Sequence, residues 1–388
     1  MDASRFLKRV PQQFILQTSS EAHMNGEQQG QTFKYKLAGI STLIGQVVSM
    51  DEWAESFKIP HRKKPGQYLS GKDIQKIIGP VESKSWDPDL FRDFTHVVSV
   101  AKEAMQGAGL GPNDIDVVMV ASSTPYEVQL DYDSFRLMRA LGIPDHIPPL
   151  QLAAGCAGMG RALSLAARLQ AKNILVVTYE ISSLYMVSPI YRYNSAHPLR
   201  DSLWASPALF SDGIAAIVLR HHDDAQGYSL YSRDSLSFGD EAGFEDPLIH
   251  YPGGGGLNPP GVERNDELAC YAMAGDQTKR YYAKGMKLNH LGLAQYNSNY
   301  YNEVARIYTH QASPNMVESY IEQYCHETQV EQGKFSTHAR RYGNLVIPST
   351  LKLIHDDLKE KKLHSGEDIA VLVVGAGPER GAFLIGVE

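Results

Sequence analysis

The chain has 388 residues, of which 43% are hydrophobic and 21% are charged, and its formal net charge at pH 7 is -7. This length is enough for one large domain or two fused domains with a sizeable core. The negative charge gives no basic field for nucleic acid, and no run approaches the roughly 20 apolar residues of a membrane span. The composition therefore predicts a globular protein that binds neither nucleic acid nor the membrane interior.

The first part of the chain and the cysteines narrow the possibilities further. Residues 1–33 are polar and without sustained periodicity, so we interpret them as an N-terminal extension. They lack the apolar segment of a signal peptide, which favours a cytoplasmic location. The three cysteines, Cys156, Cys270 and Cys325, are too few and too scattered for a disulfide framework or a C-x-x-C zinc site. We therefore expect no bound metal, and a single cysteine becomes a candidate for chemistry.

Strand and helix patterns alternate through the rest of the chain. In chain order they predict a β-rich run at 40–48, an insertion rich in Lys, Gly and Pro at 63–88, a helix at 94–107, a strand at 116–121, a helix from 156 to 171, strands at 173–178, 214–219 and 306–309, a helix at 317–329 and a strand at 369–374. The glycine run at 253–256 lacks a following helix, so we interpret it as a loop and not as a phosphate cradle. Such alternation predicts an α/β protein with a mostly parallel sheet.

Two parts of the chain repeat the same order of elements. In the first part, a strand ends just before Ser122, and Cys156 opens a helix 34 positions after Ser122. In the second part, residues 306–309 form a strand, His310 follows, and Asn344 opens a helix 34 positions after His310. Because the carboxyl ends of parallel strands meet helix N-termini, two copies of one unit would bring Cys156, His310 and Asn344 to the same end of two adjoining sheets.

The three residues selected by this repeat also fit together chemically. Cys156 lies at a predicted helix start between Gly155 and Gly158, where the helix dipole and free backbone N–H groups would lower the pKa of the thiol. Each residue alone has a plainer interpretation: Cys156 as a buried helix residue, His310 as a strand-end histidine, and Asn344 as a helix cap. Together they supply a thiolate, an imidazole and an amide donor, which are the parts needed for thioester exchange with a stabilised oxyanion.

The chain resembles the β-ketoacyl-acyl-carrier-protein synthase III branch of the thiolase superfamily. The resemblance rests on motifs in the family's order and spacing at 116–125 (DVVMVASSTP), 154–158 (AGCAG), 210–219 (FSDGIAAIVL), 309–312 (THQA), 343–344 (GN) with 347–349 (IPS), and 375–377 (GAG). It implies the α/β thiolase fold, a duplicated five-layered α-β-α-β-α architecture in a homodimer. An N-terminal half at 34–222 would hold the nucleophile, and a C-terminal half at 223–388 would hold the histidine and asparagine.

The resemblance also implies a reaction. Cys156 would take an acyl group from a CoA or acyl-carrier-protein thioester, and a Claisen condensation with a malonyl- or β-ketoacyl-type thioester would follow. His310 and Asn344 would hold the oxygen of this second thioester, and the backbone N–H groups of Cys156 and Gly377 would form another oxyanion hole. These thioesters are substrates, so no permanently bound cofactor is implied. The insertion and a Tyr-rich stretch at 185–193 suggest a specialised pocket, as in secondary-metabolite or fatty-acid-derived biosynthesis with cyclisation to a resorcinol, cyclohexanedione or pyrone precursor.

Charged residues outside the trio suggest further contacts. Arg62 and Lys63 lie where relatives hold the phosphates of CoA, and a solvated charge run is an equal alternative. Glu127 lies in the loop from which some relatives extend a glutamate across the dimer as a base, and Asp131 and Asp133 compete for this role. The predicted helix at 317–329 carries Glu318, Glu322 and Glu327 and no Lys or Arg, so docking of an acidic carrier protein on this helix is not expected.

Two other functions fit the same residues. An acyltransferase would deliver the acyl group from Cys156 to a hydroxyl or amine, with His310 as general base. A non-catalytic subunit of a heterodimer would need none of the three residues. The presence of Asn344 favours condensation over simple acyl transfer, and the intact trio argues against a non-catalytic subunit.

Overall fold

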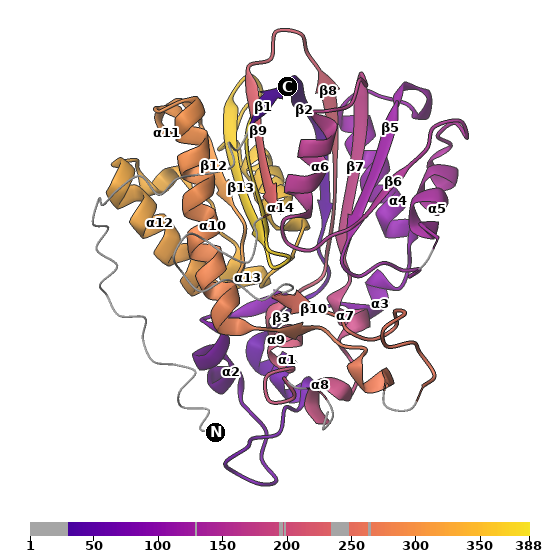
Figure 1. The fold of residues 1–388 in the computed structure, drawn as a ribbon, viewed down its shortest axis with the longest axis vertical. Coiled ribbons are helices and arrows are strands. Elements are labelled where there is room, and N and C mark those ends of the chain that lie inside the picture. The colour runs from indigo at the N-terminus through magenta and orange to yellow at the C-terminus, as the bar shows by residue number, and fades with distance from the viewer. Residues whose placement is uncertain (1–29, 129, 194–196, 198, 234–247, 263–264) are drawn as a thin grey trace.

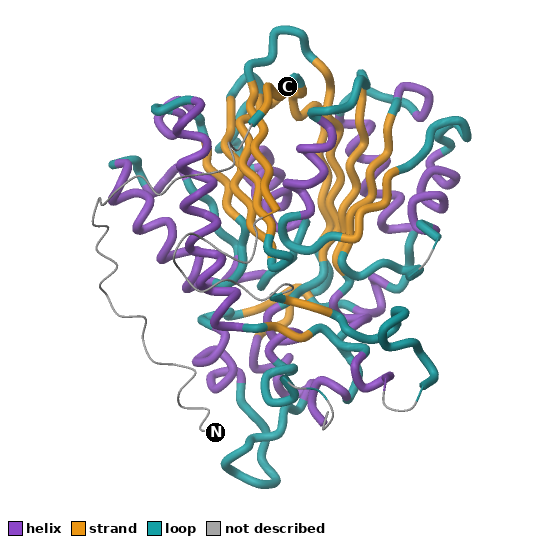
Figure 2. Tube along the Cα trace, in the orientation of Figure 1, coloured by secondary structure: helices purple, strands orange, loops and turns teal. Residues whose placement is uncertain are grey.

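The computed structural model describes residues 30–128, 130–193, 197, 199–233, 248–262 and 265–388. They form an α/β fold with one ten-stranded mixed sheet that curls around central helices (Figures 1 and 2). Residues 1–29 of the predicted extension lie outside the described residues. Within the described ranges, no helix has both the length and the apolar character needed to cross a bilayer.

The first half of the sheet has the strand order β6-β5-β7-β8-β2. Its strands are β2 (Tyr35–Leu43), β5 (Val117–Ser122), β6 (Leu150–Ala153), β7 (Asn173–Glu180) and β8 (Gly213–His221). β5 runs parallel to β6 and β7, whereas β8 is antiparallel to both β7 and β2. Every residue of β7 is buried, as expected for a strand covered by helices on both faces of the sheet.

The second half has the order β12-β13-β14-β9-β1. Its strands are β1 (Gln31–Phe33), β9 (Gly227–Arg233), β12 (Arg306–Thr309), β13 (Asp368–Gly375) and β14 (Glu379–Val387). β12 is parallel to β13, and the remaining pairs are antiparallel. β1 falls within the residues predicted to be an extension, yet it pairs with β9 and its Phe33 is fully buried. These three residues therefore belong to the sheet.

The two halves repeat one topology. The parallel pair β5 and β7, followed by the antiparallel strands β8 and β2, corresponds to the parallel pair β12 and β13, followed by β14 and β9. An isolated parallel bridge between Ile307 and Phe335 takes the place that β6 has beside β5. A short parallel pairing of Gly386 and Val387 in β14 with Lys36 and Leu37 in β2 joins the halves.

Helices cover the two halves in layers (Figure 1). α6 (Gly158–Ala166) and α14 (Pro348–Lys359) lie between the halves and contact strands of both. The outer helices are α4 (Thr95–Gly107) and α5 (Tyr132–Leu141) on the first half, and α10 (Gly275–Tyr296) and α12 (Pro314–Thr328) on the second. The order helix, sheet, helix, sheet, helix confirms the predicted five-layered fold.

A smaller group of elements covers one end of the sheet, toward the bottom of Figure 1. The elements are β3 (Val47–Ser49), α1 (Met50–Phe57), α2 (Gly71–Ile78), β4 (Ser83–Ser85), α3 (Pro88–Phe91), α7 (Ser182–Tyr185), α8 (Ile190–Tyr193), α9 (Ala205–Leu209), β10 (Ile249–His250) and β11 (Ala272–Met273). Ser49 and Ser70 precede α1 and α2 and form capping boxes. In each box the serine hydroxyl accepts a hydrogen bond from the backbone N–H three residues on, and the carboxylate of that residue accepts one from the backbone N–H of the serine. The remaining short helices are α11 (Tyr300–Glu303) and α13 (Ala339–Tyr342).

Candidate active site

Cys156 lies in the turn between β6 and α6, two residues before the helix begins. Its side chain is buried, with 9% exposed, and it lines a cavity. Gly158 lets α6 approach the segment before α14, because a Cβ at this position would lie 2.8 Å from Cδ1 of Ile347. Gly375 lets the turn after β13 approach from the other side, since its Cβ would lie 2.6 Å from the backbone N of Ala157. The nucleophile segment is thus pressed between the two halves.

The thiol does not have the lowered pKa that the predicted helix start implied. Burial raises the pKa of Cys156 to about 12, and the negative charges of Glu180 and Glu379 act in the same direction. A hydrogen bond with the side chain of Asn344 only partly opposes them. The prediction failed because it considered the helix dipole and not the loss of water around the sulfur. At neutral pH the resting thiol is therefore protonated.

His310 directly follows β12 and reaches the same cavity. Its backbone N–H donates to the carbonyl of Leu372 on β13 at 2.9 Å, and its own carbonyl accepts a 3.0 Å hydrogen bond from the hydroxyl of Tyr282. Burial, with a smaller contribution from nearby His338, lowers the pKa of His310 to about 3. The imidazole is therefore neutral, with one N–H donor and one lone pair.

Asn344 reaches the cavity from the segment before α14. Its Oδ1 accepts a 2.8 Å hydrogen bond from the backbone N–H of Val346, so its Nδ2 group, which makes the hydrogen bond to Cys156, is the donor on the cavity side. Gly343 has a φ of 70°, and a Cβ there would lie 2.3 Å from Oγ of Ser211, so this position requires glycine. The prediction that Asn344 opens a helix is wrong, because α14 begins only at Pro348, where a proline is accommodated without loss of a helical hydrogen bond.

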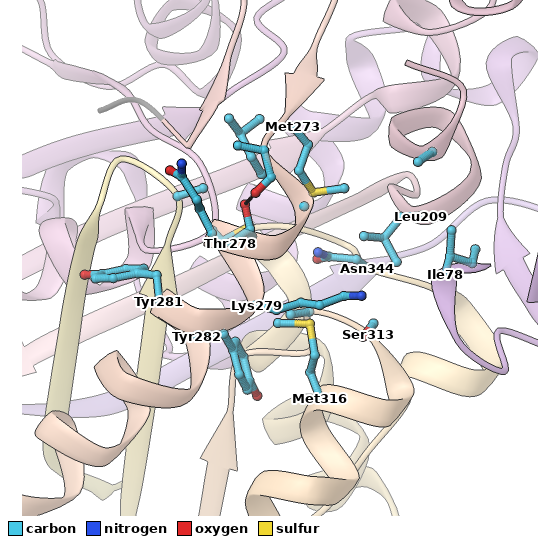
Figure 3. A pocket seen from close by; sticks show the side chains of 18 of the residues that line it. Ile78, Leu209, Met273, Thr278, Lys279, Tyr281, Tyr282, Ser313, Met316 and Asn344 are labelled. Atoms are coloured by element: carbon cyan, nitrogen blue, oxygen red, sulfur yellow. Dashed lines mark hydrogen bonds between the residues drawn. The ribbon is translucent and has the colours of Figure 1, made fainter. Parts of the chain in front are cut away.

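The cavity that these three residues line has a volume of about 400 Å³. Apolar side chains form much of its wall and come from α2, α9, β11 and α12: Ile77, Ile78, Leu209, Met273 and Met316. Figure 3 shows several of them around Asn344, with Lys279 extending from α10 toward Ile78 and Leu209. Lys279 and Asp276 are its charged lining residues. The space suits an apolar chain that ends near a thiol, an imidazole and an amide.

The pocket wall agrees only in part with the regions that the sequence suggested. The insertion contributes Ile77 and Ile78. The Tyr-rich stretch at 185–193 contributes no lining residue, and Tyr191 instead accepts a 2.9 Å hydrogen bond from the backbone N–H of Tyr271 behind the wall. β11 and the first turns of α10 form a part of the wall that was not predicted from the sequence. This region contains no recognisable motif. A high frequency of tyrosines, such as Tyr282, is its one distinctive feature in the sequence.

The other predicted site residues lie away from the cavity wall. Gly377 is exposed, while its neighbours Gly375 and Ala376 line the cavity. Arg62 forms a 2.8 Å ion pair with Asp201, the residue before Ser202 on the wall. Lys63 is exposed on the same loop as Arg62. Across the ranges that the structure describes, no three His, Cys, Asp or Glu side chains are grouped to hold a metal ion.

The three carboxylates of the loop after β5 that were candidates for a base differ in their burial. Glu127 is exposed and does not line the cavity of its own chain. Asp131 is exposed and has a φ of 51°. Asp133 is fully buried and accepts hydrogen bonds from the backbone N–H groups of Tyr126 and Glu127, at 2.8 and 3.2 Å, and from the hydroxyl of Tyr179. Asp133 therefore holds the loop that presents Glu127.

The chain is similar to known proteins in sequence. Residues 297–387 match the family described as 3-oxoacyl-[acyl-carrier-protein] synthase III C terminal. The chain is similar to β-ketoacyl-[acyl-carrier-protein] synthase III of Koribacter versatilis, with 24% identity over 336 residues that cover 83% of this chain and 94% of that protein. It is also similar to phloroglucinol synthase of Pseudomonas fluorescens, with 32% identity over 143 residues that cover 35% and 38%.

Solved structures show the same fold. A crystal structure of a 3-oxoacyl-(acyl-carrier-protein) synthase III superposes with a TM-score of 0.72 at 18% identity and covers 91% of this chain and 99% of that one. The priming β-ketosynthase of the R1128 polyketide pathway superposes with a TM-score of 0.67 at 19% identity, covering 92% and 97%.

Proposed function

We propose that this chain, which belongs to the 3-oxoacyl-[acyl-carrier-protein] synthase III-like family of condensing enzymes, carries an acyl group on Cys156 and joins it to a second thioester by Claisen condensation. The observation that carries the proposal is the meeting of Cys156, His310 and Asn344 on the wall of one largely apolar cavity. A thiol supplies the acyl carrier, and two neutral donors beside it supply oxyanion stabilisation.

In the loading step, the sulfur of Cys156 attacks the carbonyl carbon of an acyl thioester, and the bond to the leaving sulfur breaks. The resting thiol has a pKa of about 12, so it loses its proton only as the new bond forms, and the proton leaves with the departing thiol. Backbone N–H groups at Cys156 and in the turn at Gly375–Gly377 would bind the oxyanion. Gly377 is our candidate in that turn, and its exposed position leaves room for the substrate to contact it.

In the condensation step, the carbon next to the carbonyl of the second thioester first loses a proton or carbon dioxide, and negative charge develops on the oxygen of that thioester. The carbanion then attacks the acyl carbon on Cys156, the C–S bond to Cys156 breaks, and the sulfur is reprotonated. Neutral His310 and the Nδ2 group of Asn344 can both donate hydrogen bonds to that oxygen. Because the pKa of His310 is lowered to about 3, the histidine is poorly suited to holding a proton taken from carbon. Its chemistry fits a donor better than a general base, which favours condensation over simple acyl transfer.

The substrates follow from the cavity. Its apolar wall fits an acyl chain, and CoA or an acyl carrier protein would deliver it. Arg62, which is anchored by Asp201 next to the cavity, and Lys63 are candidates for contacts with the phosphates of CoA. Similarity to phloroglucinol synthase supports secondary-metabolite or fatty-acid-derived biosynthesis, including products that cyclise. A cytoplasmic location goes with this proposal, because CoA and carrier thioesters are made there.

A homodimer is part of the proposal. β6 lies at the free edge of the sheet, where a second copy of the strand could pair with it. Apolar side chains are exposed beside this edge: Val128 (79%), Leu130 (83%), Phe135 (50%) and Leu150 (37%). Covering this surface would remove an exposed apolar patch and would carry the loop with Glu127 toward the neighbouring subunit.

The test is intact-protein mass spectrometry after incubation with a panel of acyl-CoA and acyl-carrier thioesters. We expect a single acyl adduct on Cys156 and a carbon-carbon product after a malonyl- or β-ketoacyl-type thioester is added. Transfer of the adduct only to hydroxyls or amines would replace condensation with acyl transfer. Absence of an adduct with every thioester would contradict the proposal.

A further inference from the structure

Lys84 is a buried amine that the reaction above does not use. Its side chain is fully buried in β4, within the insertion. The ammonium group lies 4.8 Å from the ring centre of Trp53 and 4.2 Å from that of Trp86. Lysine is almost never buried unless its charge is compensated. In the part of the chain that the structure describes, no carboxylate pairs with it at ion-pair distance, so the compensation must come from other groups.

Two backbone carbonyls provide that compensation. The Nζ of Lys84 donates to the carbonyl of Phe210 at 2.6 Å and to the carbonyl of Pro207. Both acceptors lie at the C-terminal end of α9, whose last carbonyls have no helical partner. Burial lowers the pKa of Lys84, and Asp212 partly opposes this shift. An amine donates N–H groups to these carbonyls in either protonation state.

The segment held by Lys84 is the one that holds Asn344. Phe210 and Asn344 form a parallel β-bridge. In this bridge, the backbone N–H of Asn344 donates to the carbonyl of Leu209 at 3.1 Å, and the N–H of Ser211 donates to the carbonyl of Asn344 at 2.9 Å. Lys84 therefore binds the carbonyl of Phe210, and the two neighbours of Phe210 are hydrogen-bonded to the backbone of Asn344.

β4 also holds the other flank of Asn344. The backbone N–H of Glu82 donates to the carbonyl of Arg340 at 2.8 Å, and the hydroxyl of Ser83 donates to the carbonyl of Arg341 at 2.6 Å. A Cβ at Gly343 would lie only 3.4 Å from the Cβ of Lys84. β4 thus packs against the residues just before Asn344, while the side chain of Lys84 reaches the segment hydrogen-bonded to it.

We propose that Lys84 is a positioning residue for Asn344: it fixes the Pro207–Phe210 backbone on which the oxyanion donor of the condensation step rests. This inference depends on the proposed role of Asn344. Lys84 does not line the cavity, so it acts through Asn344. A displacement of about 1 Å at a reacting group can cost about a hundredfold in rate, which makes such a support significant.

The test compares loading and condensation in Lys84→Met, which keeps an unbranched side chain as far as the Cε position and removes the Nζ that donates both hydrogen bonds. We expect loading of Cys156 within about twofold of the wild type and a condensation rate per loaded enzyme that falls about tenfold to a hundredfold. Lys76→Met is the matched control, because Lys76 is an exposed lysine of the same insertion whose Nζ pairs with Asp73 on its own helix. It should change neither step.

A double-variant cycle separates positioning from general destabilisation. In the Asn344→Ala background, Lys84→Met should cause no further fall in condensation, because the group that it positions is gone. Equal losses in loading and condensation, or an additive loss in the double variant, would overturn the inference. If Lys84→Met does not fold, Lys84→Gln is the second variant. Its polar side chain is one atom shorter than that of lysine, so its amide does not occupy the position of Nζ, and the same selective loss is expected.

Different results would contradict the proposed function and the role of Lys84. If wild-type enzyme forms no adduct on Cys156, or if Asn344→Ala condenses at the wild-type rate, the proposed function is wrong. If those two results agree with the proposed function and Lys84→Met condenses normally, only the role of Lys84 is wrong.

Discussion

Arg161 and Glu379 form a 2.7 Å ion pair that joins the helix after Cys156 to the strand after the Gly375–Gly377 turn. Arg161 also donates to the carbonyl of Ala153 on β6 at 2.9 Å, and Glu379 accepts a 2.6 Å hydrogen bond from the hydroxyl of Tyr231. The side chain of Glu379 is only 5% exposed. The pair therefore links the two sides of the loading site across the boundary between the two halves of the fold.

We predict that Arg161→Met lowers the free energy of unfolding by about 2–3 kcal/mol, because it leaves the buried carboxylate of Glu379 without its cation. Adding Glu379→Leu should recover part of the loss, since no unpaired charge then remains. Urea unfolding of the single and double variants measures both effects. A double variant less stable than Arg161→Met would show that the carboxylate stabilises the fold through Tyr231 and not through the ion pair.

Several strands could be predicted because they are buried and largely apolar, but the prediction of a mostly parallel sheet is wrong, because β2, β8, β9 and β14 join the sheet mainly through antiparallel pairs. The expected strands at 173–178, 306–309 and 369–374 correspond to β7, β12 and β13. β1 could not be predicted, because a three-residue strand in a polar segment shows no periodicity. The helix after Cys156 ends at Ala166 and not at the predicted residue 171. The sequence does not mark this end, because residues 167–171 are as apolar and as helix-compatible as those before them.

The residues of the site could be predicted from the sequence, whereas the pKa of the thiol and the support of Asn344 could not. The repeated spacing led to the expectation that Cys156, His310 and Asn344 meet, and the structure brings them to one cavity, while their roles stay predictions. The pKa of the thiol was predicted in the wrong direction, because burial depends on residues distant in sequence. Lys84 is connected to Asn344 through hydrogen bonds to backbone carbonyls. The sequence alone does not predict which carbonyls a lysine side chain contacts.

The pH dependence of alkylation tests the electrostatics of Cys156. In a Cys270→Ala/Cys325→Ala background, we expect the rate with iodoacetamide to keep rising above pH 9, because the pKa of Cys156 is raised to about 12 and only the thiolate reacts. Glu180→Gln removes one of the negative charges that raise this pKa, so it should increase the rate at pH 8. A plateau below pH 8 would show that the field of the helix start outweighs burial.

Acyl loading should depend on one cysteine. Cys156→Ala should abolish the adduct, whereas Cys270→Ala and Cys325→Ala should retain it, because neither of these residues lines the cavity. Intact-mass measurements with the best acyl thioester report the adduct directly. An adduct that persists in Cys156→Ala and turns over with the second substrate would move the nucleophile elsewhere.

Asn344→Ala should separate the two steps. Loading should continue, while condensation per loaded enzyme should fall about a hundredfold or more, as expected when an oxyanion donor is removed. Single-turnover measurements starting from the acyl-enzyme give the second step alone. Loss of loading with normal condensation per loaded enzyme would assign Asn344 to the first oxyanion instead.

A substitution of Glu127 tests whether the second substrate loses carbon dioxide. Joining two acyl groups without decarboxylation requires a base to remove a proton from carbon, and His310 is better suited to donating a hydrogen bond. Glu127 is exposed in one chain, and pairing of two copies along β6 would bring it toward the neighbouring subunit. If the enzyme joins two acyl groups without decarboxylation, Glu127→Gln should load normally and fail to condense, and the wild type should release no carbon dioxide.

The matched control for that experiment is Asp131→Asn, which changes an exposed carboxylate of the same loop and should condense normally. Asp133→Asn is unsuitable, because Asp133 is buried and holds the loop through Tyr126 and Tyr179, so we expect it to destabilise the protein. A malonyl-type substrate generates its carbanion by losing carbon dioxide and needs no carboxylate base. Full activity of Glu127→Gln with one carbon dioxide released per product would therefore exclude the joining of two intact acyl chains and leave decarboxylative extension as the reaction.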